Sequence, residues 1–273
     1  MKRWMVFALV VIGVLSFPAV LLARGAEGGK VVGMADEPLF LECQDHFYNG
    51  EYSRAKRCFS RYIALDPDDS RGYWREAYAT YFQLKAEQKT TFPVLGKNAR
   101  DKFLGMINKG IAETDRGIEA RDNVKFELYV QACLLSMRGG IEARNVGWFT
   151  ARATLKLVLS TAARSKYQDA EYLIGLTNYN GASHSIVFFL AGLPHKRNLG
   201  LAELLAATVK NNGPYVDDIW FAIFGIAAGN IEDGTEIKKP ALNKEATKKI
   251  AETLARKYPR NKALREYLAR YCR

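Results

Sequence analysis

Apolar residues recur at the spacing of an α-helix along most of the chain, and this pattern limits what the chain can fold into. One stripe, with members three or four residues apart, consists of Phe126, Tyr129, Val130, Cys133, Leu134 and Met137. Similar stripes run from Trp220 to Ala227 and from Leu264 to Tyr271. Such a stripe makes one face of a helix apolar, and that face must be buried against a neighbour. No segment reads as part of a sheet, so the sequence predicts an all-α fold.

Turn-forming residues interrupt these stripes at intervals. Asn49-Gly50, Asp66-Pro67-Asp68 and Asn212-Gly213-Pro214 are typical of turns, and we interpret Gly139-Gly140 and Asn180-Gly181 in the same way. The breaks divide the chain into about five helix pairs and a final capping helix. The expected helices are 36–49 with 51–65, 69–88 with 97–119, 122–138 with 146–165, 168–180 with 198–211, 215–229 with 243–257, and 260–272.

The first helix pair carries a denser pattern. Its large, small, turn-forming and aromatic positions are occupied by Leu39, Cys43, Gly50, Tyr52, Ala55, Phe59, Leu65 and Pro67. Gly50 allows the chain to reverse, Ala55 allows two helices to approach closely, and Pro67 ends the second helix. In this order and spacing the segment resembles the 34-residue tetratricopeptide repeat. It departs from the repeat at Tyr62, where a small residue is usual.

The resemblance continues more loosely beyond the first pair. Residues 165–230 look like exported bacterial tetratricopeptide-like proteins, and residues 257–261 resemble the end of one repeat. Steps between equivalent positions after the first are longer than the standard period. The resemblance implies an irregular right-handed helical solenoid over residues 26–273, with a concave surface for a partner. It supplies no catalytic residues.

The first 25 residues have the three parts of a secretory signal. Lys2 and Arg3 supply positive charge, the run Met5–Ala23 is uncharged and mostly apolar, and Ala23 and Gly25 are the small residues that a signal peptidase reads. An uncleaved membrane anchor is the alternative. A spanning helix needs roughly 20 apolar residues, and the run Met5–Ala23 is close to that length. In either case we expect an exported protein, periplasmic or tethered to the membrane.

The chain is basic, with a formal net charge of +11. An excess of this kind can attract nucleic acid, anionic lipid or an acidic protein. The charges occur as short pairs such as Lys56-Arg57 and Lys248-Lys249, without a long basic run. Together with the expected export, this distribution argues against a nucleic-acid partner and favours solvated helix faces.

The chain has four cysteines, enough for two disulfides in an exported protein. Cys43 and Cys58 fall on facing helices of the first pair, where a bridge requires Cα atoms about 4.4–6.8 Å apart. The alternative is that they are two small buried residues that only pack together. Cys133 and Cys272 lie far apart along a solenoid, and we expect them to be unpaired.

The sequence contains no constellation typical of an enzyme. It has no glycine-rich phosphate loop, no nucleophile elbow and no histidine pair with metal-ligand spacing. His46 is expected to be a buried structural residue, and His184 and His195 flank an apolar run. We therefore expect no metal, no cofactor and no catalytic activity.

Aromatic and polar side chains on the first helix of each pair are the candidate contacts, because those helices line the concave side of a solenoid. The candidates are Tyr73, Arg75, Tyr81, Lys125 and Tyr129. The first hypothesis is therefore a scaffold in the cell envelope that binds a protein or peptide in its groove.

A second hypothesis starts from the apolar run 186–194, which is too short to span a bilayer. The run is either buried between repeats or forms an exposed lip, with Phe188, Phe189 and Leu190 at its centre, that touches a membrane or a hydrophobic ligand. If the run and Trp220 enclose a cavity of roughly 300–1,000 Å³, the protein is a carrier of a small ligand or lipid that works with a membrane transporter.

Overall fold

The computed structural model describes residues 38–88, 93–121, 123–167, 169–183, 197–210, 215–232 and 243–271. Within these ranges the chain forms eleven α-helices and no strand, which confirms the predicted all-α class. The helices are α2 (Pro38–Tyr48), α3 (Tyr52–Leu65), α4 (Ser70–Gln88), α5 (Lys97–Glu119), α6 (Val124–Asn145), α7 (Trp148–Ser165), α8 (Ala170–Ser183), α10 (Arg197–Lys210), α11 (Val216–Glu232), α12 (Lys244–Lys257) and α13 (Lys262–Tyr271).

Two of the expected turns are helical instead. Gly139 and Gly140 lie inside α6, which continues to Asn145, and α8 runs through Asn180-Gly181 to Ser183. At Gly139 a Cβ atom would lie 2.9 Å from a methyl carbon of Leu155 on α7. The glycine is therefore required by the close approach of α6 and α7, and not by a reversal of the chain.

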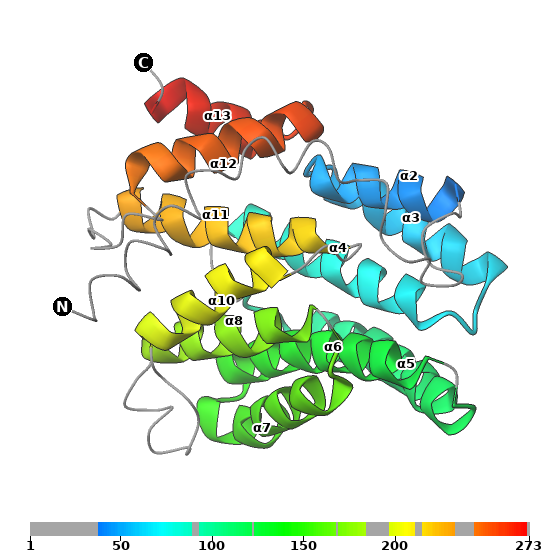
Figure 1. Ribbon diagram of the computed structural model, residues 1–273. Coiled ribbons are helices and arrows are strands. Elements are labelled where there is room, and N and C mark those ends of the chain that lie inside the picture. The colour runs from blue at the N-terminus through cyan, green and yellow to red at the C-terminus, as the bar shows by residue number, and fades with distance from the viewer. Residues whose placement is uncertain are drawn as a thin grey trace.

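Each described helix packs against the next described helix in the chain, from α2 to α13. Additional contacts join α4 with α6, α6 with α8, and α2 with α4. Figure 1 shows the result as a succession of helices from α2 and α3, through α5 to α7, back to α11, α12 and α13. This order of packing keeps most neighbours local in sequence, as in stacked helix pairs.

The two ends of this succession meet. One core cluster combines Phe40 and Phe59 of the first pair with Leu254, Tyr258 and Leu264 of the C-terminal helices. Figure 1 shows the turn between α12 and α13 near the end of α2. The described helices therefore close on themselves, whereas an open solenoid keeps its ends apart.

Polar contacts between two turns reinforce this closure. The amide of Asn261 donates to the carbonyl oxygen of Tyr48 at 2.8 Å, and the backbone N–H of Arg260 donates to the Asn49 side chain at 2.9 Å. The Arg260 guanidinium also donates to Glu51 at 3.0 Å and to Asp45 at 2.6 Å. We call this set of contacts between the α2–α3 turn and the α12–α13 turn the closing contact.

Several expectations fall outside the described residues. They concern the signal or anchor at residues 1–25, the lip at Phe188, Phe189 and Leu190, and the pairing of Cys272. Among the helices that the structure describes, none combines the length and the apolar character needed to cross a bilayer.

Candidate binding groove

Three of the five candidate contact residues belong to the core. Arg75 and Tyr129 have 0% of their surface exposed, and Tyr81 has 9%. The expectation that these side chains offer a surface to a partner is therefore corrected, because the closed succession of helices fills the inner side where they point. Lys125 is exposed at the start of α6, and Tyr73 is half-buried on α4.

The buried Arg75 side chain is held by an ion pair across the molecule. Its guanidinium donates one hydrogen bond to a carboxylate oxygen of Asp218 on α11 at 3.1 Å, and the other carboxylate oxygen lies 3.0 Å away as part of the ion pair. The guanidinium also donates to the hydroxyl of Tyr48 at 3.3 Å. It also lies 4.2 Å from the ring centroid of Trp74 and 4.7 Å from that of Tyr215. A buried cation is stabilised by a carboxylate that faces it and by the faces of aromatic rings.

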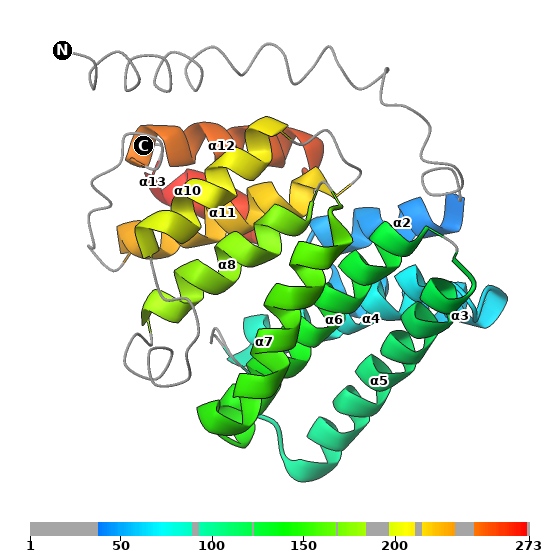
Figure 2. The same ribbon diagram turned by 60° about the horizontal axis from the view of Figure 1, so that its bottom comes forward.

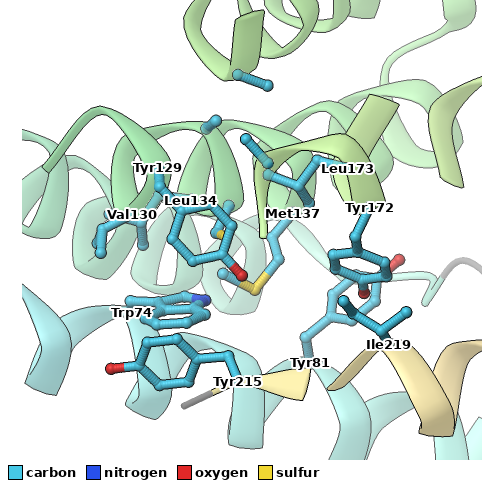
Figure 3. Close-up of a cluster of buried hydrophobic side chains, with 14 of the residues drawn as sticks. Trp74, Tyr81, Tyr129, Val130, Leu134, Met137, Tyr172, Leu173, Tyr215 and Ile219 are labelled. Atoms are coloured by element: carbon cyan, nitrogen blue, oxygen red, sulfur yellow. The ribbon is translucent and has the colours of Figure 1, made fainter. Parts of the chain in front are cut away.

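Aromatic side chains from several helices fill the space around this pair. Figure 3 shows Trp74 of α4, Tyr129 of α6, Tyr172 of α8 and Tyr215 from the start of α11 gathered in one cluster. The Trp74 ring lies 5.5 Å from that of Tyr129 and 4.8 Å from that of Tyr215, both edge to face. The geometry is that of a packed core.

The tyrosines and the cysteine of this core are held in their neutral forms. Burial raises the pKa of Tyr78 and Tyr129 well above the usual range, and it does the same for the thiol of Cys133. Only the thiolate form of a cysteine is a strong nucleophile. Cys133, which is free and buried, is thus an unreactive core residue.

Tyr73 points away from this core into a groove on the outer side. The groove has a volume of about 480 Å³ and lies between α3, α4 and α5. Its lining consists of Ser60, Ile63, Tyr73, Glu76, Lys102, Gly105, Met106 and Lys109. Of the five candidate contacts, Tyr73 alone belongs to this lining.

Close helix packing positions Tyr73 in the groove. At Gly110 of α5 an added Cβ atom would lie 2.9 Å from the Cβ of Tyr73, so a glycine is needed where α4 and α5 approach. Partial burial raises the pKa of Tyr73, and the negative charge of Glu113 adds to the effect. The phenol therefore stays protonated at neutral pH and is able to donate a hydrogen bond.

The charges of the groove are unequal. Lys102 and Lys109 are seven residues apart, which places them on the same side of α5, and both are exposed. The single carboxylate, that of Glu76, already accepts a hydrogen bond from the hydroxyl of Ser60 at 2.6 Å. The lining itself therefore carries two lysines and one carboxylate beside Tyr73 and the apolar Ile63 and Met106, while Glu113, Asp68 and Arg116 lie close enough to act on Tyr73 electrostatically.

Sequence reasoning missed the two lysines of the groove. Their seven-residue spacing on a single helix face is visible in the sequence, with Gly105 between them. The spacing does not reveal that Ser60 and Ile63 of α3 form the opposite wall, because that depends on how α3, α4 and α5 pack.

The remaining candidate residues, the cysteine pair and His46, have structural roles. The structure joins Cys43 and Cys58 in a disulfide, with Cα atoms 5.2 Å apart. His46, expected to be buried, is half-buried, and its Nδ1 lies 2.6 Å from a carboxylate oxygen of Glu51. In the part of the chain that the structure describes, no three His, Cys, Asp or Glu residues are grouped in a way that could hold a metal ion.

Comparisons with known proteins identify no relative. No protein-family model matches the chain, and neither the curated proteins nor the solved structures include a match.

Proposed function

We propose that this protein is a non-catalytic binding protein that captures an extended, acidic segment of a partner protein in the groove between α3, α4 and α5. The observation that carries the proposal is the composition of the groove, in which Tyr73 lies with Lys102 and Lys109 beside two apolar side chains. The proposal keeps the partner class expected from the tetratricopeptide-like resemblance and places its site on the outer side.

The lining supports a peptide because it combines two kinds of contact. The rings and methylenes of Tyr73, Ile63 and Met106 can bury an apolar side chain, and tyrosines are frequent anchors at interfaces. Lys102 and Lys109 attract carboxylates and accelerate encounter with an acidic partner. A groove of about 480 Å³ that is open to solvent accommodates a few residues of a chain that continues beyond it.

The filled interior supports this placement by elimination. The inner side of α4, where the resemblance implies a concave binding surface, is occupied by the Arg75–Asp218 pair and its aromatic neighbours. We propose that the protein retains the helix-pair stacking of a tetratricopeptide-like solenoid, that it is exported, and that closing of the ends has shifted binding from the inner to the outer side.

The test begins with a photocrosslinking amino acid in place of Tyr73, in the full chain in its native cells. We expect crosslinks to one protein through a segment rich in Asp and Glu. For a synthetic peptide of that segment, Tyr73→Ala should weaken binding by about 2 kcal/mol, or roughly 30-fold. Lys102→Glu with Lys109→Glu should weaken peptide binding more than Tyr73→Ala does, and the affinity should then depend less on salt.

The control is Lys249→Glu with Arg256→Glu, which makes the same charge change on exposed positions of α12. This variant should keep the affinity of the wild type. Crosslinks to a segment without acidic residues, or an affinity that the groove variants leave unchanged, would refute the proposed site. Crosslinks to lipid or a small molecule instead of protein would favour the carrier hypothesis.

A further inference from the structure

Exposed apolar side chains gather near one peripheral helix. In the described part of the chain, the large hydrophobic residues with more than a third of their surface exposed are Leu41, Leu65, Val94, Val146, Phe149 and Leu157. Val146 lies two residues before α7, and Phe149 and Leu157 lie on α7, with exposed fractions of 54%, 71% and 52%. Half of the set thus falls within one short stretch of chain.

Val94 belongs to the same region of the surface. The side chain of Asn145, at the end of α6, accepts a hydrogen bond from the Leu95 N–H at 2.7 Å and donates one to the Pro93 carbonyl at 3.1 Å. These bonds hold the loop before α5 against the turn between α6 and α7. Figure 2 shows the start of α5 and that turn at the same lower end of the molecule.

The charged residues around these apolar side chains are basic. α7 contains no Asp or Glu, and it exposes Arg152, Lys156 and Arg164. Lys97 at the start of α5 and Arg144 before Val146 are also exposed. We call this surface the α7 edge; it consists of Val94, Val146, Phe149 and Leu157 with Lys97, Arg144, Arg152, Lys156 and Arg164.

The apolar and basic side chains of α7 point outward together. Successive residues of a helix are about 100° apart, so Lys156 projects within about 20° of Phe149, and Arg164 projects between Phe149 and Leu157. Both α6 and α8 pack against α7, and the buried residues Ala151, Val158 and Ala162 project from its opposite side. Figure 1 shows α7 at the lower edge of the molecule, away from α12.

We infer that the α7 edge docks on the surface of an anionic lipid bilayer. Exposed Phe and Leu side chains that alternate with Lys and Arg are the composition of a helix that lies in a membrane interface. Complementary charge selects this occupant over a second copy of the chain, because two α7 edges would bring like charges together. The inference does not rest on the proposed function, since it uses none of the residues that line the groove.

The experiment places an environment-sensitive fluorophore on α7 in the full-length chain. Phe149→Cys in a Cys272→Ser background is labelled with NBD without reductant, so that the Cys43–Cys58 bridge stays closed and buried Cys133 stays unlabelled. The label reports on α7 even if residues 1–25 attach the chain to every vesicle. We expect brighter, blue-shifted emission with phosphatidylglycerol vesicles and none with phosphatidylcholine vesicles.

Charge reversal measures the contribution of the basic residues. Each basic residue near an anionic surface contributes roughly fivefold to binding, so Lys156→Glu with Arg164→Glu should raise the lipid concentration at half-maximal response by ~25-fold or more. The α12 variant Lys249→Glu with Arg256→Glu should leave the response unchanged. A label at Leu65→Cys, exposed at the end of α3, should show no response to lipid.

Two outcomes would overturn the inference. One is an NBD signal at position 149 that is the same with anionic and neutral vesicles. The other is a response to an acidic protein or to polyglutamate in the absence of a response to anionic vesicles, which would assign the α7 edge to a protein partner. Circular dichroism of each variant shows whether the helical content is preserved.

Discussion

The two faces of α4 carry similar residue types, but one face is buried in the core and the other borders the outer groove. Tyr73 and Arg75 are two residues apart, and both are polar or aromatic residues that commonly contribute to interfaces. Their side chains project about 200° apart around the helix, so they face opposite sides. Arg75 has no exposed surface and is paired with Asp218, whereas Tyr73 lies half-buried in the groove with Lys102 and Lys109.

The difference shows that helices distant in sequence determine whether a residue of α4 is buried or exposed. Arg75 is buried because α11, which begins about 140 residues later in the chain, brings Asp218 against it. Tyr73 lies in a groove lined by α3, α4 and α5, and α3 and α5 are the immediate neighbours of α4 in sequence. The inner face is thus buried when the helices close, whereas the outer face stays open to the partner that we propose.

The largest effect should come from breaking the inner face. Arg75→Met leaves the Asp218 carboxylate buried without its partner, which typically costs about 3–5 kcal/mol of the free energy of unfolding. Tyr73→Ala, on the outer face of the same helix, should cost less than about 1 kcal/mol. Urea unfolding followed by circular dichroism measures both changes.

A double variant separates the ion pair from simple loss of packing. In Arg75→Met with Asp218→Leu no charge remains buried, and most of the lost stability should return. If Arg75→Met and Tyr73→Ala cost the same, or if the double variant is less stable than the sum of the single variants, the comparison between the two faces fails.

The disulfide provides the next largest effect. Cys43→Ala with Cys58→Ala removes a link between residues 15 apart, for which loop-closure entropy predicts a loss of about 3 kcal/mol. Both cysteines lie in the core cluster that joins the first and last described helices, so the loss concerns the closed interior. Peptide binding by the still-folded variant should keep its wild-type affinity.

Reductant provides the matched control for this variant. Dithiothreitol should lower the unfolding free energy of the wild type under conditions where the bridge is reduced, and it should leave the double variant unchanged. Equal stability of the wild type and the variant without reductant would show that the bridge contributes nothing to the closed interior.

The sequence predicted the helices well because their signals are local. The stripe from Phe126 to Met137 and the turn at Asp66-Pro67-Asp68 depend only on nearby residues, and α6, α3 and α4 lie where those signals place them. The error at Gly139 has a different origin. A glycine that relieves contact with Leu155 of the next helix has the same sequence signature as a glycine that turns the chain.

The candidate site was only partly predictable for a similar reason. Helical periodicity places Tyr73, Arg75 and Tyr81 on α4, but it does not say which face of α4 meets α11. That information lies in the contact between the first and last described helix pairs, where Asn261 meets Tyr48 across 213 residues of sequence. A single open solenoid and a closed one therefore have the same local pattern.

The smallest expected effect concerns the pH dependence of the closing contact. Partial burial raises the pKa of Glu51, but hydrogen bonds from His46 and Arg260 outweigh it and leave the pKa below the ordinary value of 4.5. A carboxylate whose pKa is lowered on folding stabilises the folded state above its unfolded pKa, and this stabilisation is lost as pH falls through the folded pKa. Since the site is near the surface, we expect a contribution below about 1 kcal/mol.

Glu51→Gln isolates this contribution because it removes the charge and keeps the shape. The wild type should be the more stable protein at pH 7, and the difference in urea midpoint should shrink below about pH 4.5, where the wild-type carboxylate takes up its proton. Glu119→Gln, at an exposed position at the end of α5, should follow the wild-type curve closely. If the Glu51→Gln difference persists unchanged to pH 3, the charge of Glu51 does not hold the two ends together. The closing contact would then depend on the buried Asn261 amide and the aromatic cluster beneath it, and acid should not open the interior before it unfolds the whole chain.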